Sequence, residues 1–146
     1  MSTSALTEDR PATTRETAAA IRRALREAFP ATRFSVTMQR GSAYGWIDVI
    51  WTDGPTWREV EAITSGFESS RFSGMDDAYH RTENSQWSCR GVSTTRRISE
   101  DVLERLRTQV RRNAQGDLIV AGCVECCMSL GGVEQAIWRH AAHLSL

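Results

Sequence analysis

Lysine is missing from this 146-residue sequence, so every Lys or Arg position holds arginine. These 18 arginines balance 18 acidic residues, which gives a formal net charge of zero at pH 7. A neutral chain has no global attraction to nucleic acid or to an anionic membrane. An all-arginine composition is typical of a GC-rich coding genome, but arginine also makes bidentate contacts to carboxylate and phosphate that lysine does not make. Both explanations stay open here.

Long hydrophobic runs are also missing. No segment approaches the roughly 20 apolar residues that a membrane-spanning helix needs. The N-terminus has no basic segment followed by an apolar one, which a secretory signal would require. We therefore expect a cytoplasmic protein, with no membrane as a partner.

The strongest local signals lie between residues 46 and 77. Alternating apolar residues predict a half-buried strand over residues 46–51, and Asp53-Gly54-Pro55 ends it. Thr56 and Glu59 have the spacing of a capping box, which predicts that a helix begins there. Residues 72–77 are expected to form a loop.

The segments before and after this unit predict further helices and strands. A second capping box, Thr13 with Glu16, predicts a helix that ends before Pro30. Residues 33–39 alternate and should pair antiparallel with residues 46–51. Residues 79–81 and 91–98 indicate a second hairpin that extends the sheet.

The last third of the chain is expected to be mostly helical. Ser99 is expected to cap a helix that runs to about residue 112. Residues 118–123 fit either a strand or the start of a buried helix, and residues 133–143 fit a helix.

These elements predict an α+β fold, in which helices pack on a small antiparallel sheet of three to four strands and a helical extension follows. We expect a flexible N-terminus over residues 1–12, an α+β domain over 13–113, and a C-terminal extension over 114–146 that packs on that domain.

Two predicted helices have arginine-rich outer faces. Such a face is often no more than solvated, but it could also bind the acidic surface of a protein or line the phosphates of a nucleic acid. The candidate partner-binding residues are Arg22, Arg23, Arg26, Arg105, Arg107 and Arg111.

Cysteine and histidine residues near the C-terminus resemble a zinc site. Cys123 and Cys126 form a C-x-x-C pair, and His140 and His143 follow thirteen residues later. The histidine spacing is shorter than usual, and cysteines often pack as small buried hydrophobes. We therefore expect no cofactor, with zinc as the alternative. A redox role for the C-x-x-C pair is weaker, because no βαβ unit surrounds it.

No catalytic motif is evident. Cys89 and His80 could serve as nucleophile and base, but no local signature supports them. Asp76 and Asp77 with Asp53 or Glu59 could hold a cation, although Asp-rich loops are mostly turns. We expect the protein not to be an enzyme.

The stretch IDVIWTDGPTWREVEAITSGFESSRFSGMDDAYH resembles the large polyvalent protein-associated domains, and the preceding AIRRALREAFPATRFSV belongs to the same match. The resemblance covers roughly residues 17–98. It implies a setting in very large proteins of phages and conjugative plasmids, which enter the recipient cell with the DNA. It supplies no catalytic residues and does not include the C-x-x-C and H-x-x-H tail.

The resemblance and the missing catalytic motif together suggest a function. We expect a non-enzymatic protein that binds a host or defence-system protein, as an anti-CRISPR inhibitor would, in the host cytoplasm. The alternative is a small nucleic-acid-binding protein that uses the same arginine-rich faces.

Overall fold

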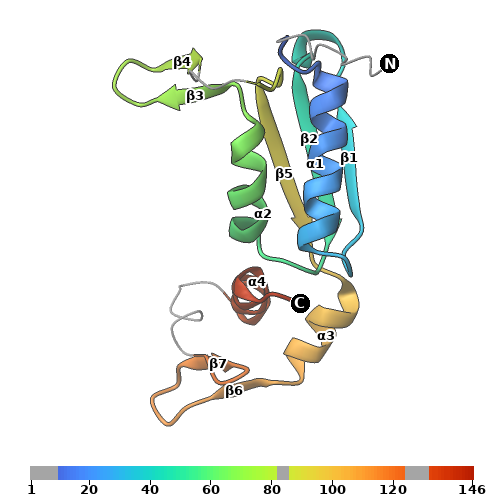
Figure 1. Ribbon diagram of the computed structural model, residues 1–146. Helices are drawn as coiled ribbons and strands as arrows, with labels where there is room; N and C mark the ends of the chain where they lie inside the picture. The colour runs from blue at the N-terminus through green and yellow to red at the C-terminus, as the bar shows by residue number, and fades with distance from the viewer. Residues whose placement is uncertain (1–9, 82–85, 124–131) are drawn as a thin grey trace.

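The computed structural model describes residues 10–81, 86–123 and 132–146. Figure 1 shows the helices and strands in chain order. They are α1 (Thr14–Ala28), β1 (Phe34–Met38), η1 (Gly41–Ala43), β2 (Trp46–Thr52), α2 (Trp57–Thr64), η2 (Ser65–Phe67), β3 (Ser70–Ser73), β4 (Ala78–Arg81), β5 (Gly91–Arg97), α3 (Glu100–Arg107), β6 (Val110–Arg112), β7 (Leu118–Val120) and α4 (Val133–His143).

The predicted α+β class is confirmed. Both predicted capping boxes form, Thr13 with Glu16 before α1 and Thr56 with Glu59 before α2. Ser99 caps α3, where its hydroxyl accepts a hydrogen bond from the amide of Val102. Local sequence signals therefore fix where these three helices begin.

The main sheet has the strand order β1-β2-β5, and it is mixed rather than antiparallel. β1 pairs antiparallel with β2, as predicted, but β5 pairs parallel to β2. A parallel pair needs a long crossover, and the chain between β2 and β5 supplies one that contains α2. The prediction that residues 91–98 form a hairpin strand was therefore wrong.

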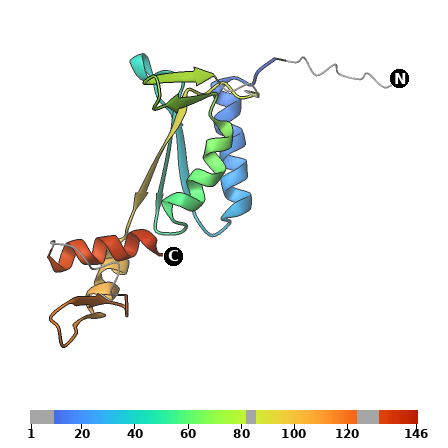
Figure 2. The same ribbon diagram turned by 90° about the vertical axis from the view of Figure 1, so that its left-hand side faces the viewer.

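Helices α1 and α2 lie on one face of this sheet (Figure 2). They bury the apolar residues that alternate along the strands, among them Val36, Ile47, Val49 and Trp51. Ile21 and Leu25 of α1 complete this core with no exposed surface. The residues that alternate with these along each strand lie on the opposite face of the sheet.

A second hydrophobic core lies below the first (Figure 1). It joins Leu103 and Leu106 of α3 to Val120 of β7 and Ile137 of α4. The predicted helix over residues 99–112 was too long, because α3 ends at Arg107 and residues 110–112 form β6, which pairs antiparallel with β7. The predicted boundary between residues 113 and 114 stays a prediction, although these contacts group α3 with the C-terminal elements.

The β3–β4 hairpin projects away from the main sheet (Figure 1). Its turn carries Met75, whose side chain is 99 % exposed. The predicted loop over residues 72–77 is thus partly strand, since β3 extends to Ser73. The expected partner of residues 79–81 was wrong as well, because β4 pairs with β3 and not with residues 91–98.

None of the helices in the described ranges has the length and apolar character that crossing a membrane requires. The N-terminal residues 1–9, part of the predicted flexible segment, lie outside the described residues.

Candidate functional site

The arginines of α1 lie on the face of the helix that points away from the core. Thr17, Ala18, Ile21 and Leu25 bury the inner face, which leaves the intervening positions exposed. The predicted residues Arg22, Arg23 and Arg26 are all exposed. Arg22 also reaches the edge of the sheet, where its Nη2 donates a hydrogen bond of 2.6 Å to the carbonyl oxygen of Val36. This bond fixes one guanidinium beside strand β1.

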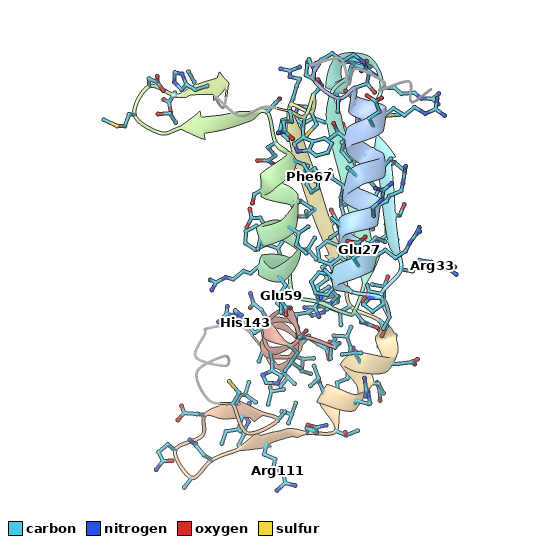
Figure 3. The ribbon with its side chains drawn as sticks, viewed as in Figure 1. Glu27, Arg33, Glu59, Phe67, Arg111 and His143 are labelled. Carbon is cyan, nitrogen blue, oxygen red and sulfur yellow. The ribbon has the colours of Figure 1, made fainter. Side chains whose placement is uncertain are left out.

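A hollow of about 440 Å³ opens where α1 ends and the chain turns into β1. Its lining contains three arginines, Arg22, Arg26 and Arg33, around the apolar residues Pro30 and Phe34. The described residues that line it include no carboxylate, although Glu27 follows Arg26 on α1 and is labelled near Arg33 in Figure 3. Within the described ranges, the side chains of Arg26 and Arg33 form no hydrogen bond or ion pair. The hollow is therefore a concentrated positive surface.

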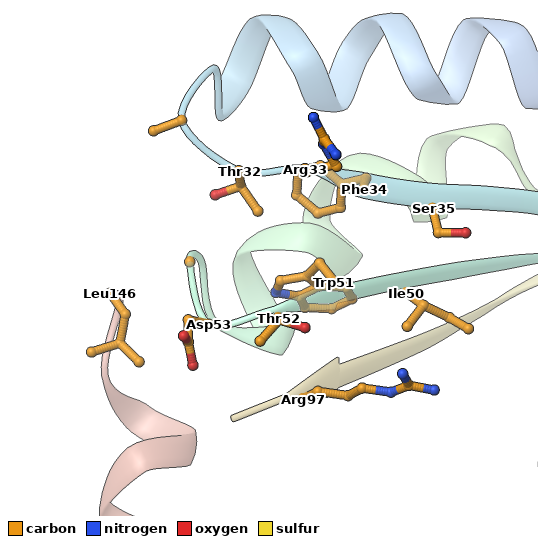
Figure 4. A pocket seen from close by; sticks show the side chains of 12 residues that line it. Thr32, Arg33, Phe34, Ser35, Ile50, Trp51, Thr52, Asp53, Arg97 and Leu146 are labelled. Carbon is orange, nitrogen blue, oxygen red and sulfur yellow. The ribbon is translucent and has the colours of Figure 1, made fainter. Parts of the chain in front are cut away.

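A larger hollow of about 840 Å³ adjoins the first, and both are lined by Ala31, Thr32, Arg33 and Phe34 (Figure 4). It extends across the ends of β1, β2 and β5 to Arg97 and Asp53. Sequence reasoning did not select Arg33 or Arg97, because isolated arginines at strand ends carry no periodic signal. Only the fold brings them to one surface.

The arginines of α3 and β6 form a different surface from those of α1. Figure 1 places β6 at the opposite end of the molecule from α1, and Figure 3 labels Arg111 there. Arg105 and Arg111 are exposed, as predicted. The six predicted arginines therefore do not form one continuous patch.

Arg107 differs from the other five because acidic residues surround its guanidinium. It forms ion pairs with Glu134 at 2.9 Å, Glu104 at 2.9 Å and Glu100. Hydrogen bonds to Glu134, Glu100 and Glu104, in that order, raise the pKa of Arg107, and the hydrogen bond to Arg107 lowers the pKa of Glu134. Arg107 thus links α3 to α4 and offers little free charge to a partner.

The residues predicted as a zinc site are only partly described. His140 is 7 % exposed, and its Nδ1 has no hydrogen-bond partner among the described residues. Burial, and then the nearby His143, lower the pKa of His140. Cys123 is half-buried after β7, whereas Cys126 lies outside the described residues. Across residues 10–81, 86–123 and 132–146, no three His, Cys, Asp or Glu side chains are placed to hold a metal ion.

The candidate nucleophile and base lie in different parts of the fold. Cys89 is completely buried in the main core, where burial raises its pKa to about 11 and its Sγ donates a hydrogen bond to the carbonyl oxygen of Phe67. His80 lies on the projecting hairpin, where its Nε2 contacts Asp76 at 2.6 Å. A thiol with a raised pKa is a poor nucleophile at neutral pH. Cys89 and His80 therefore do not form a nucleophile–base pair in this structure.

The WTDGP segment forms a structural joint between the two cores. Trp51 Nε1 donates to the carbonyl oxygen of Pro55 at 3.0 Å, and the Asp53 carboxylate accepts the amide of Ser99 at 2.8 Å. Gly54 has a φ of +60°, and a Cβ there would lie 2.5 Å from Thr32 Oγ1. Turn geometry and helix capping thus account for the residues of the motif.

Arg96 completes this joint, and sequence reasoning missed it. Its guanidinium donates to the carbonyl oxygens of Asp53 and Gly54 at 3.1 and 3.0 Å. It also donates to three carbonyl oxygens at the end of α4, namely Ala141, Ala142 and Leu144, at 3.1, 3.2 and 2.6 Å. A charged residue on the inward face of a strand was the signal that could have identified it.

The family model described as large polyvalent protein associated domain 29 matches residues 12–111. No curated protein and no solved structure matches the sequence. The matched range contains the main core, the joint around Asp53, and α3. It ends before β7 and α4, so the predicted zinc residues lie outside it.

Proposed function

Because the chain belongs to the large polyvalent protein associated domain 29 family, we propose that it is a non-enzymatic protein-binding protein of a phage or conjugative element. The family links the chain to mobile genetic elements. In this proposal the protein counteracts a host defence system, as an anti-CRISPR inhibitor does, by binding a host or defence protein in the cytoplasm.

The observation that carries the proposal is the hollow at the end of α1. Arg22, Arg26 and Arg33 line it together, and none of the other described residues in its lining is acidic. Arginine makes forked, bidentate hydrogen bonds to carboxylates, and it is enriched among the residues that dominate binding energy at protein interfaces. Pro30 and Phe34 add apolar contact area between the charges. The surface therefore fits a partner that presents acidic side chains around an apolar residue.

The α3 and β6 arginines support the proposal less. Arg107 is held by Glu100, Glu104 and Glu134, so a partner would have to replace contacts that already exist. Arg105 is exposed on the same helix, which makes it a matched control for charge changes on α1.

A pull-down from a bacterial lysate tests the proposal. The tagged protein is compared with a variant that carries R22A, R26A and R33A, and with R105A as the control, each with and without nuclease treatment. We expect a stoichiometric protein partner that survives nuclease, is lost with the triple variant and is kept with R105A. A partner retained by the triple variant would contradict the assignment of this surface.

The biological part of the proposal needs a separate measurement. Bacteria with an active CRISPR system and a plasmid for this protein are challenged with a targeted phage, and plaques are counted. Protection of the phage that the triple variant abolishes would support an inhibitor of that system. Equal plaque counts with and without the protein, across a panel of defence systems, would reject the anti-defence role.

A small nucleic-acid-binding protein is the second candidate, and the same hollow favours it, since guanidinium groups also bind phosphates. It predicts that partners vanish from the pull-down after nuclease treatment. It also predicts an affinity that falls steeply as salt rises, because each phosphate contact releases counterions. Weak salt dependence would reject this candidate.

A further inference from the structure

The face of the main sheet opposite α1 and α2 is covered by no element in the described part of the chain (Figure 2). Its side chains are mostly short and polar, and most of them are exposed. The exposed residues are Ser35 and Thr37 on β1, Thr52 on β2, and Ser93, Thr95 and Arg97 on β5. We call this surface the open sheet face.

Strand pairing places a residue of β2 between the hydroxyl groups of β1 and β5, and in one row that residue is Asp48, between Thr37 and Ser93. Ser35 lies opposite Ile50, which in turn lies opposite Thr95. Among the described residues of this face, Ile50 is the one aliphatic side chain. Sheets that pack on another sheet bury an apolar inner face. The open sheet face is therefore a poor match for a second copy of this sheet, and it fits a polar partner.

Trp46 lies at one end of the open sheet face, opposite Gly91. Its six-membered ring covers the glycine so closely that a Cβ there would fall 2.5 Å from Cζ3. The indole remains half-buried, so the rest of its surface faces solvent. An aromatic ring held in this way is a platform on which a base can stack.

Arg97 lies at the other end, opposite Thr52, where it lines the hollow of about 840 Å³ (Figure 4). Its side chain forms no hydrogen bond or ion pair within the described ranges, although its carbonyl oxygen accepts the Asp53 amide at 2.7 Å. Asp53 lines the same hollow, and its carboxylate accepts the Ser99 amide. Asp48 lies on the open sheet face itself, between Thr37 and Ser93, and its carboxylate accepts Gln39 Nε2 at 2.7 Å. Within the described ranges, Arg97 is thus the one cation on the strand positions of this face.

The spacing between the two ends suits an extended chain. Trp46 and Thr52 are the first and last residues of β2, which at about 3.3 Å per residue separates Trp46 from Arg97 by roughly 20 Å. The hydroxyls lie between them as donors and acceptors for sugars or base edges, together with Asp48, whose carboxylate can accept from base amino groups. Proteins bind single-stranded nucleic acid through aromatic platforms, hydrogen-bonding side chains and cationic side chains, and this face carries one or more of each.

We propose that the open sheet face binds single-stranded nucleic acid, with Trp46 stacking on a base, the strand hydroxyls contacting sugars or base edges, and Arg97 contacting a phosphate. This site lies beside the arginine hollow at the end of α1, because Arg33 lines both that hollow and the one that Arg97 lines. It goes beyond protein binding.

Fluorescence anisotropy with a labelled twelve-residue oligothymidylate tests this proposal on the full chain. The variants are R97Q, which removes the charge but keeps the length, and W46L, which keeps apolar bulk without the aromatic ring. R105Q is the control, because it makes the same charge change on α3. Circular dichroism establishes that each variant folds, and R97Q remains informative if W46L does not fold.

We expect saturable binding that W46L weakens at least about fivefold, because stacking contributes about 1–3 kcal/mol per base. R97Q should weaken binding and reduce the slope of log affinity against log salt by about one, whereas R105Q should change neither. Decaglutamate should not compete.

Three results would overturn the proposal. The first is no saturable binding, and the second is equal affinity for a blunt duplex of the same length. The third is competition by decaglutamate, or an equal loss with R105Q, either of which would indicate a general attraction between charges.

The R22A, R26A and R33A variant separates the two functions: if it loses the protein partner but keeps the oligonucleotide, the sites are independent. Loss of oligonucleotide binding with this variant, but not with R97Q, would move the nucleic acid to the α1 hollow and reject the open sheet face.

Discussion

At the scale of single residues, Arg96 has the widest effect on the fold. Its five hydrogen bonds join the turn at Asp53 and Gly54 to the last carbonyl groups of α4. Backbone carbonyls that lose a donor away from water are costly, because they gave up solvent hydrogen bonds when the chain folded. Arg97, the next residue, faces the open side of the sheet and makes none of these contacts. Substitution of Arg97 is therefore a matched control for substitution of Arg96.

We expect R96Q to lower the free energy of unfolding by about 2–4 kcal/mol, since glutamine cannot reach all five acceptors. R97Q should change it by less than about 0.5 kcal/mol, as exposed substitutions usually do. Urea denaturation followed by tryptophan fluorescence measures both values. Similar losses for the two variants would mean that Arg96 has no special role in the joint.

His140 links stability to pH. Burial, and to a smaller extent His143, lower its folded-state pKa below 6.5, so the folded protein prefers the neutral imidazole. The unfolded chain then binds a proton more readily, and stability falls as the pH drops from about 6.5 towards the folded-state pKa. At higher pH the side chain is neutral in both states and this effect is absent.

The substitution H140Q separates this effect from the titration of the acids. Wild-type protein should lose melting temperature between pH 7.5 and 5.5, whereas H140Q should lose clearly less over that range. The carboxyls of Glu16, Glu59 and Asp76 have lowered pKa values, so their losses begin only as the pH falls below their ordinary values near 4. Parallel melting curves for the two proteins from pH 7.5 to 5.5 would reject the role of His140.

At the scale of elements, local chemistry predicted the helix starts, and tertiary contacts decided the rest. A capping box needs only residues three apart, so Thr13 and Thr56 could be read from the sequence. The partner of β5 could not, because alternation says which face is buried but not which neighbour a strand chooses. Residues 110–112 likewise became a strand because β7 was available to pair with them.

The same limit applies to the candidate site. The exposure of Arg22, Arg23 and Arg26 follows from helical periodicity, which the sequence carries. Their grouping with Arg33 depends on how tightly the chain turns after Pro30, and the separation of Arg107 depends on Glu134 of α4. Both are contacts between elements, and periodicity contains no information about them.

The capping box of α2 gives a prediction for a whole element. The Thr56 hydroxyl accepts the Glu59 amide, and the Glu59 carboxylate accepts the Thr56 amide at 2.6 Å. We expect T56A to lower the free energy of unfolding by about 1 kcal/mol, while T56S keeps the cap and costs much less. Urea denaturation measures both, and T52A, at an exposed strand residue, is the control. Equal losses for T56A and T56S would mean that the threonine methyl, not the hydroxyl, matters.

At the scale of the whole molecule, two hydrophobic cores meet at one polar joint. The contacts of the joint that connect the two cores include those of Arg96, the bond from Ser99 to Asp53, and the bond from the Leu146 amide to the carbonyl oxygen of Gly54 at 2.8 Å. The strength of a hydrogen bond depends on its distance and angle more than the strength of an apolar contact does. Weakening the joint should therefore loosen the smaller core without unfolding the larger one.

Hydrogen exchange on R96Q tests this view of the joint. The amides of α3 and α4 should exchange faster than in the wild-type protein, while those of α1 and β2 keep their protection, because their core packs without Arg96. R107Q is the control, since it breaks the ion pairs between α3 and Glu134 but leaves the joint intact. It should disturb exchange in α3 and α4 less than R96Q does. A uniform increase over both cores in R96Q would instead mean that the chain opens as one cooperative unit, with the joint as part of a single core.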